Sequence, residues 1–210
     1  MPEECYAILS HLRQTGNMQW YVVPLLVFVI YVYVTEMERK NYATVYLSLA
    51  FFFAEALWEM FNAFILSSTG YAPLWGTPGG NSAFIIYAGL NIEIAFFFAV
   101  SGIILIKSLP ENKETKILGV ANRVFVPVAY GLFAVFVEVL LNQAGLLTWR
   151  WSFWKWPNIW LIIIAYCLPF YALVWCHDHW STAQKKKAAQ IFFVLAVLCH
   201  LVFASVLGII

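Results

Sequence analysis

The clearest shortage in this sequence is of charged residues, which make up only 11% of its 210 positions. An ordinary soluble domain carries about 25% charged residues, so this chain lacks the polar side chains that a fully hydrated surface requires. The formal net charge is +1. A protein with so little excess positive charge offers no electrostatic footprint for nucleic acid, and we predict no such partner.

Cysteine and metal-binding patterns are also scarce. Cys5, Cys167, Cys176 and Cys199 are widely scattered and form no CxxC pair. The sequence therefore gives no support to a disulfide framework or a zinc site. It also contains no glycine-rich loop of the kind that binds nucleotides. We expect neither a metal nor a cofactor.

Apolar residues, in contrast, make up 63% of the chain and gather in long runs. A membrane helix needs about 20 consecutive, mostly apolar residues. Six runs meet this condition approximately, at 20–36, 43–66, 83–107, 118–142, 157–176 and 188–210. Residues 1–19 form a polar leader. The sequence predicts an all-α, polytopic integral membrane bundle of about six transmembrane helices, in a single domain covering 1–210.

The distribution of basic residues predicts the orientation of this bundle. The first, third and fifth loops between the spans hold most of them: Arg39, Lys40, Lys107, Lys113, Lys116, Arg123, Lys185, Lys186 and Lys187. The segments on the opposite side of the membrane hold only Arg13, Arg150 and Lys155. Because Lys and Arg favour cytoplasmic loops, we predict that both termini lie on the outer side. The protein would be a multi-pass protein of the cytoplasmic membrane (the inner membrane in a bacterium). We expect the protein to contact the lipid bilayer, and a homo-oligomer or a larger membrane complex is also possible from the sequence.

Four glutamates lie within the predicted spans, each near an asparagine. They are Glu55 and Glu59 with Asn62 on one face of the second span, Glu93 with Asn91 near the middle of the third, and Glu138 with Asn142 in the fourth. Ionisable side chains at membrane depth are costly, and they normally face a cavity or a partner. A carboxyl without a nearby cation in a low-dielectric interior tends to stay protonated. Such a group is a proton donor.

Three interpretations of these carboxyls compete. They are polar contacts that hold helices together, general acids and bases acting on a lipid-soluble substrate, or parts of a proton or cation pathway. Four carboxyls are more than interhelical contacts usually need. Our leading hypothesis is therefore catalysis by Glu59, Glu55, Glu93 and Glu138 inside a polar cavity that opens toward the outer half of the membrane.

Tryptophans gather at the outer end of the fourth and fifth spans. They are Trp149, Trp151, Trp154, Trp156 and Trp160. Such a cluster is typical of an interfacial aromatic belt, and it can also form a wall or lid over a binding cavity. We expect a hydrophobic small-molecule substrate to contact Trp58, Asn62, Asn91, Asn142, Trp149 and Trp151.

The segment His177-Asp178-His179 ends the fifth span. Two histidines and a carboxylate can bind iron or zinc. On a helix, however, residues i and i+2 point to different faces, so His177 and His179 would not converge on one ion. We interpret the segment as a helix end at the membrane interface.

The second span contains the run 56–64, ALWEMFNAF, after a short first span and a charged turn with Arg39. This arrangement resembles the second helix of membrane-bound terpene cyclases of meroterpenoid pathways. The stretch Gly89-Leu90-Asn91 resembles, more loosely, part of their third helix. The resemblance implies that Glu59 protonates the substrate. Those cyclases usually have seven helices and an aspartate in the last one, whereas the last span here has no carboxylate.

The segment from Glu138 to Asn158 is similar to the carotenoid hydratases and cyclases. The likeness rests on Glu138, Gly145, Trp149-x-Trp151 and Pro157-Asn158. Both groups add protons to isoprenoid double bonds or epoxides inside the membrane. The two resemblances imply a lyase or isomerase of isoprenoid biosynthesis that needs no cofactor. The alternatives are a non-catalytic subunit of a membrane complex and a small transporter of protons, ions or solutes.

Overall fold

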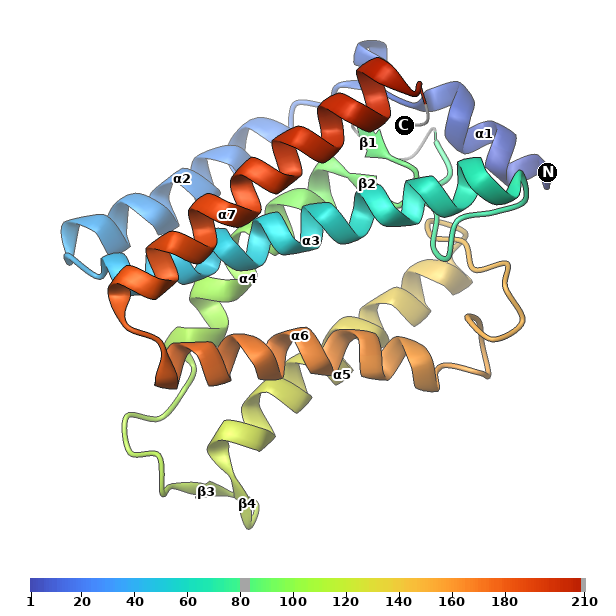
Figure 1. The fold of residues 1–210 in the computed structure, drawn as a ribbon. Coiled ribbons are helices and arrows are strands. Elements are labelled where there is room, and N and C mark those ends of the chain that lie inside the picture. Colours follow the sequence, from blue (N-terminus) through green and yellow to red (C-terminus); the bar gives the residue numbers. More distant parts are fainter. Residues whose placement is uncertain (80–83, 209–210) are drawn as a thin grey trace.

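A computed structural model describes residues 1–79 and 84–208 of the chain. Helices dominate this part of the protein (Figure 1). They are α1 (Glu3–His11), α2 (Val22–Glu38), α3 (Tyr42–Thr69), α4 (Ile92–Lys107), α5 (Asn122–Gln143), α6 (Trp160–His179) and α7 (Thr182–His200). A 3-10 turn (Thr15–Asn17) follows α1, and a π-helical turn (Leu201–Val206) continues α7.

Two short β-hairpins correct the predicted starts of the third and fourth spans. Strands β1 (Ile85–Tyr87) and β2 (Leu90–Asn91) precede α4, and β3 (Lys116–Ile117) and β4 (Val120–Ala121) precede α5. In the second hairpin, Leu118 and Gly119 have φ angles of 49° and 83°. Two successive positive φ angles make a tight turn and exclude a helix there. Residue 83 of the predicted third span and residues 209–210 of the last lie outside the described residues.

Among the described residues, four helices are long and apolar enough to cross a membrane: α3, α5, α6, and α7 with its π-helical turn. Helices α2 and α4 have 17 and 16 residues. At 1.5 Å per residue they extend about 24–26 Å, which is less than the roughly 30 Å of a bilayer core. Large apolar side chains are exposed along α2, α6 and α7, for example Phe28, Ile164, Leu168 and Phe193. Extended apolar surfaces of this kind suit contact with lipid, and the predicted all-α membrane architecture is confirmed at this level.

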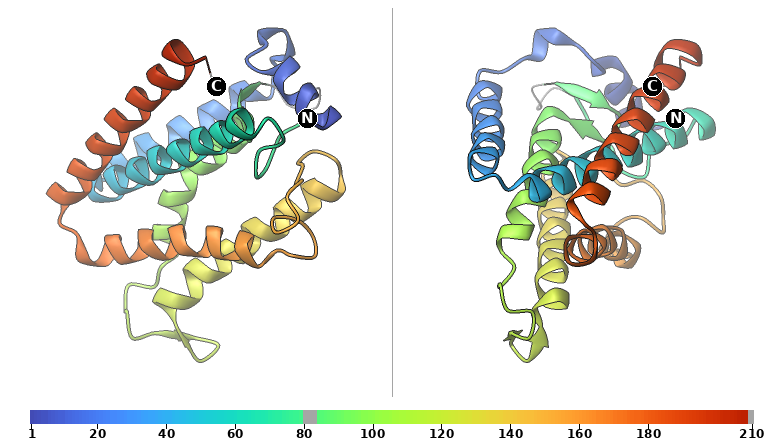
Figure 2. Two further views of the ribbon diagram at one scale, coloured as in Figure 1. Left: turned by 45° about the vertical axis from the view of Figure 1, so that its right-hand side comes forward. Right: turned by 60° about the vertical axis from the view of Figure 1, so that its left-hand side comes forward.

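The helices pack in neighbouring pairs. Figures 1 and 2 show α7 running along α3, and α6 running beside α5. Phe51 of α3, Phe98 of α4 and Phe170 of α6 meet in a shared hydrophobic core. Helices α5 and α6 approach closely at Gly131, where a Cβ atom would lie 2.6 Å from the Cys167 Sγ. Small residues permit such backbone approach between membrane helices.

The leader is part of the folded structure. Cys5 and Ile8 of α1 are buried in a core cluster that also contains residues of α3 and α7. Beyond α1, Leu12 forms a parallel bridge to Ile85 of β1. The Arg13 backbone N–H donates to the Ile85 carbonyl over 2.9 Å. The amphipathic start of the chain thus covers the end of the bundle where β1 and β2 lie.

Two buried acidic side chains near the helix ends are neutralised by bases. Glu36 of α2 is 2% exposed and lies 2.6 Å from the Lys107 Nζ at the end of α4. Asp178 of α6 pairs with Arg123 at 2.9 Å and with Lys113 at 3.4 Å. These pairs join α2 to α4 and α6 to α5 and its preceding loop.

The His-Asp-His segment lies at the last residues of α6. Asp178 is engaged with Arg123, and the His179 ring stacks on Trp175 with centroids 4.8 Å apart. Within residues 1–79 and 84–208, no group of three His, Cys, Asp or Glu is placed to hold a metal ion. Asp178 and His179 are thus engaged in contacts at the end of α6.

Candidate functional site

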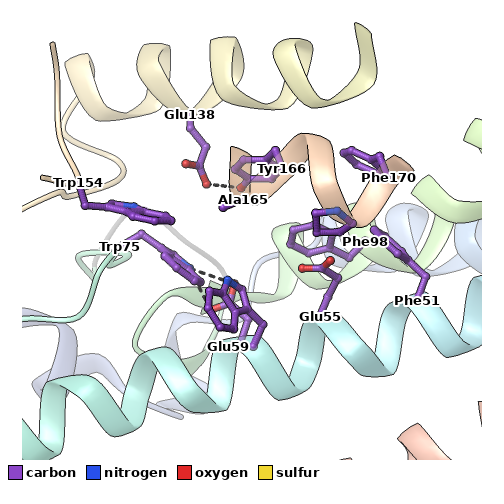
Figure 3. Close-up of a pocket in the computed structure, with 12 residues that line it drawn as sticks. Phe51, Glu55, Glu59, Trp75, Phe98, Glu138, Trp154, Ala165, Tyr166 and Phe170 are labelled. Atoms are coloured by element: carbon purple, nitrogen blue, oxygen red, sulfur yellow. Dashed lines mark hydrogen bonds between the residues drawn. The ribbon is translucent and has the colours of Figure 1, made fainter. Parts of the chain in front are cut away.

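Three of the four predicted carboxyls line one cavity of about 30 Å³ (Figure 3). Glu55 and Glu59 enter it from α3, and Glu138 enters from α5. The other lining residues are Phe51, Trp58, Trp75, Phe98, Trp154, Ala165, Tyr166, Pro169 and Phe170. No Lys or Arg is among these described lining residues. The site is thus a carboxyl-rich, aromatic-walled recess with room for one or two water molecules.

Glu59 is held by a tryptophan that the sequence analysis did not select. Glu59 is 4% exposed, and the Trp75 Nε1 lies 3.1 Å from each of its two carboxyl oxygens. Glu55 lies one turn earlier on the same face of α3, as its spacing predicts. The indole N–H therefore fixes the Glu59 carboxyl while Glu55 stands beside it.

The loop that carries Trp75 is fixed from α3 and from the β1–β2 hairpin. The Asn62 side chain donates to the Trp75 carbonyl and accepts from the Leu74 N–H, both over 2.7 Å. The Thr77 N–H donates to the Ala88 carbonyl over 2.9 Å. Asn62, which we predicted to bind substrate, is fully buried and positions this loop.

Close packing and the α5–α6 loop complete this support. A Cβ atom at Gly89 would lie 2.4 Å from the Trp75 Nε1, so the hairpin backs the indole only because this residue is glycine. Gly76 pairs with Thr148 through two backbone hydrogen bonds of 2.8 and 3.0 Å. The Trp151 Nε1 donates to the Ala72 carbonyl over 3.1 Å.

Glu138 is positioned by a second aromatic donor. The Tyr166 hydroxyl of α6 donates a hydrogen bond to the Glu138 Oε1 of α5 (Figure 3). Because Tyr166 is the donor, Glu138 presents an accepting oxygen to it. The cavity thus contains two carboxyls with different partners, Glu59 with an indole and Glu138 with a phenol.

Glu93 lies outside this cavity, and its expected position was wrong. It belongs to the first turn of α4, because the predicted start of that helix is a hairpin. The Tyr21 hydroxyl donates to its carboxyl. Glu93 lines a separate cavity of about 220 Å³, whose lining also includes Glu138 and Tyr166. Asn91 is the N-cap of α4 and accepts from the Ile94 N–H over 2.9 Å.

The other expected binding residues divide between cavity and support. Trp58 lines the cavity. Asn142 donates to the Leu147 carbonyl over 2.9 Å and so stabilises the end of α5. Trp149 is buried in the core cluster behind the cavity. Trp149 and Trp151 thus support the wall of the site, whereas Trp154 is the member of the tryptophan cluster that lines it.

Several cavity residues were not among the substrate-binding residues that we predicted, and Trp75, Trp154 and Tyr166 are the polar ones. Trp154 was visible as a member of the tryptophan cluster, whereas Trp75 lies in an uncharged loop that carries no local signal. Tyr166 is an ordinary aromatic residue of an apolar helix. Its importance depends on the rotation of α6 relative to Glu138, which the sequence does not specify.

A larger groove of about 560 Å³ adjoins the carboxyl cavity. It runs along α3 and α6, with Phe192 of α7 on its border, and its lining is apolar apart from a few side chains. The groove and the cavity share Phe51, Glu55, Trp58, Trp154, Ala165 and Pro169. A hydrophobic molecule in the groove would therefore approach the carboxyls from one side.

Comparison with known proteins identifies the family of the chain. Residues 2–205 match a family described as an uncharacterized membrane protein family. The chain belongs to this family. A relative from Archaeoglobus fulgidus, described as an uncharacterized protein, is 38% identical over 202 residues, which cover 95% of this chain and 94% of the relative. No solved structure matches the chain.

Membership of this membrane protein family agrees with the four long apolar helices. The membrane character that we predicted from composition is thereby confirmed. The match also extends over the whole carboxyl cavity, since Glu55, Glu59 and Glu138 all lie within residues 2–205.

Proposed function

We propose that this protein is a membrane-embedded enzyme that protonates a lipid-soluble, isoprenoid-like substrate, as cyclases and hydratases do. The observation that carries the proposal is the convergence of Glu55, Glu59 and Glu138 on one aromatic-walled cavity without a basic lining residue. Interhelical contacts alone do not require three carboxyls to meet at a cavity. The resemblance of the second helix to terpene cyclases, and of the segment after Glu138 to carotenoid hydratases, supports the same chemistry.

In the proposed reaction, Glu59 is the general acid. Its carboxyl proton is transferred to one carbon of a double bond, whose π electrons form the new C–H bond and leave a carbocation at the other carbon. The Trp75 N–H then stabilises the Glu59 carboxylate that remains. Because this donor is already in place, the charge develops in a site that needs little rearrangement.

The walls and the second carboxyl complete the cycle. Faces of Trp58, Trp75 and Phe98 stabilise a carbocation through cation–π attraction. In a hydration, a water oxygen bonds to the cation and loses a proton to Glu138. In a cyclisation, a second double bond attacks the cation, and Glu138 accepts the proton lost from carbon. Return of that proton from Glu138 to Glu59 within the same cavity restores both groups.

Mass spectrometry of lipid extracts from an isoprenoid-producing host tests this proposal. Wild type, Glu59→Gln, Glu114→Gln and an empty vector are compared at equal amounts of membrane-inserted protein. Glu114 is a matched control because it is exposed in the α4–α5 loop. Loss of a general acid costs about a hundredfold or more in rate. We expect a product made by wild type and Glu114→Gln and lost in Glu59→Gln.

Identical extracts from wild type and empty vector would overturn the proposal for the isoprenoids of that host. A product that persists in Glu59→Gln would retain an enzyme but remove the general acid from α3. Because glutamine has nearly the same volume as glutamate, we expect Glu59→Gln to fold. A Tm in detergent equal to that of wild type would show that lost product reflects lost chemistry and not lost folding.

The proposal includes a six-span topology. Helices α2 and α4 would cross the membrane despite their length, with polar groups near their ends reaching the interface and the bilayer thinning locally. Both termini would then lie outside, as the positive-inside rule indicates. In this orientation the ion pairs of Glu36 and Asp178 lie at the cytoplasmic side.

A proton pathway is a second candidate, and one observation favours it. Glu138 and Tyr166 line both the carboxyl cavity and the cavity that contains Glu93. A chain of carboxyls through adjoining cavities can carry protons. Proteoliposomes with an internal pH dye would show proton flux that Glu93→Gln and Glu138→Gln both reduce. An enzyme of the proposed kind requires no such flux.

A further inference from the structure

Trp154 carries a buried donor that lacks an acceptor. The side chain is 7% exposed, and its Nε1 has no hydrogen-bond partner within the described part of the chain. Trp75 stacks on it with ring centroids 5.7 Å apart (Figure 3), and the Trp75 N–H is engaged by Glu59. Two stacked indoles therefore differ in one respect, since one N–H is satisfied by the protein and the other is not.

Buried polar groups in native proteins are nearly always hydrogen-bonded, so an exception calls for an explanation. Trp154 lines both the carboxyl cavity and the larger groove, together with Glu55 and Trp58. Its indole thus lies at the junction of a polar recess and an apolar channel. A donor at such a junction fits an acceptor on a bound molecule.

The groove beyond this junction is built for an apolar chain. Leu47, Ala50 and Ala54 line it from α3, and Leu161, Ile164 and Leu168 line it from α6. The three α6 side chains are 47%, 57% and 63% exposed, so this edge of the groove faces the surroundings of the helix bundle. In a bilayer that edge contacts lipid. The volume of about 560 Å³ lies within the usual range of small-molecule sites.

We propose that the groove between α3 and α6 takes a linear isoprenoid sideways from the bilayer, and that a hydroxyl or carbonyl oxygen on this chain accepts a hydrogen bond from the Trp154 Nε1. The inference rests on the proposed function and adds the route by which the substrate enters and the donor that holds its oxygen. The apolar chain lies along α3 and α6. Its oxygenated end lies at the junction, beside Glu55, which is the carboxyl that lines both the groove and the cavity.

Photolabelling tests binding without requiring turnover. The probes are geranylgeraniol carrying a diazirine and the corresponding diazirine hydrocarbon, which lacks the hydroxyl. Each is irradiated with full-length protein in lipid nanodiscs, and the labelled peptides are identified by mass spectrometry. The variants are Trp154→Phe, which removes the donor, and Ala172→Trp, which fills the groove at one of its lining positions. Trp160→Phe is the control, because Trp160 is 74% exposed and lines neither the groove nor the carboxyl cavity.

In wild type and Trp160→Phe we expect the alcohol to label groove-lining residues of α3 and α6 at about three- to tenfold lower concentration than the hydrocarbon does, as one neutral hydrogen bond predicts. Trp154→Phe should abolish this difference and keep the labelling by hydrocarbon. Ala172→Trp should prevent labelling of the groove by both probes.

Equal labelling by alcohol and hydrocarbon in wild type would overturn the assignment of Trp154. Labelling that Ala172→Trp leaves unchanged, spread over the outward faces of α2 and α7, would indicate surrounding lipid only and overturn the groove as well. The proposed function fails separately. Specific labelling together with no product in the extracts would leave this site standing and remove the protonation chemistry.

Discussion

The Trp75 Nε1 lies 3.1 Å from both carboxyl oxygens of Glu59. The indole comes from a loop that α3, the β1–β2 hairpin and the α5–α6 loop all hold through hydrogen bonds. Because these contacts hold the loop in place, the Trp75 N–H stays at one position and keeps the carboxyl beside it. The relationship therefore sets the position of Glu59, and the proposed acid is oriented before any substrate enters.

Trp75→Phe should lower product formation while preserving the fold. Phenylalanine keeps an aromatic face against Trp58 and Trp154, but it cannot donate to Glu59. Hydrogen bonds to charged groups contribute about 1.5–3 kcal/mol, so we expect a reduction of about 10- to 100-fold in product per inserted protein, measured by mass spectrometry. Trp156→Phe is the control, because Trp156 is 57% exposed. Equal product from Trp75→Phe and wild type would show that the indole does not support the acid.

Asn62→Ala should destabilise the protein. The substitution leaves the Leu74 N–H and the Trp75 carbonyl without the partner that each has over 2.7 Å. Each buried, unsatisfied polar group costs about 1–3 kcal/mol, so we expect a loss of about 2–5 kcal/mol. Thermal unfolding in detergent should show a clearly lower Tm, whereas Ser68→Ala on the exposed end of α3 should leave the Tm nearly unchanged. A wild-type Tm for Asn62→Ala would mean that the loop is held without this amide.

Lys107→Met should destabilise the junction of α2 and α4 through Glu36. Removing one partner of a buried pair costs about 3–5 kcal/mol, but Lys107 is 42% exposed and water screens part of its effect. We expect the free energy of unfolding, measured by chemical or thermal unfolding, to fall by about 1–3 kcal/mol. The double variant Glu36→Gln, Lys107→Met should recover most of the lost stability, because the neutral glutamine leaves no buried charge without a partner. The exposed Lys116→Met is the control, and additive losses in the double variant would argue against this pairing.

Cysteine labelling in intact cells should determine the orientation of the bundle. In a background with the four native cysteines replaced by alanine, Leu118→Cys and Ser152→Cys each introduce one exposed thiol. Leu118 is 88% exposed at the β3–β4 turn, and Ser152 is exposed in the α5–α6 loop. A membrane-impermeant maleimide should label position 152 and spare position 118 until the cells are opened. The reverse pattern would invert the proposed topology.

Local spacing was sufficient to place some of the site. Glu55 and Glu59 share a face of α3 because residues four apart lie one turn apart on any helix. The sequence also identified Glu138 as a membrane carboxyl and Trp154 as part of a tryptophan cluster. These conclusions depend on composition and helical periodicity, which do not change with the packing of other elements.

Other residues lie in surroundings that the sequence did not predict, because these surroundings depend on contacts distant in sequence. Glu93 was expected near the middle of a helix, but β1 and β2 shorten α4 and move this residue to its first turn. The route of the α5–α6 loop places Trp149 in a buried core cluster and Trp151 in a hydrogen bond to the Ala72 carbonyl, whereas their contact with substrate stays a prediction. Trp75 could not be foreseen, since its position depends on hydrogen bonds to α3, to the hairpin and to a loop more than 70 residues away.

By itself, the sequence determined that this protein is helical, apolar and suited to a membrane, with carboxyls on the interior faces of its helices. The reason is that burial in lipid requires apolar runs and internally satisfied backbones, and both leave a local pattern. Only the tertiary structure decided which carboxyls meet, which indoles reach them and where an apolar groove joins the cavity. Those features follow from helix rotation and loop path, which are fixed by packing between segments far apart in the chain.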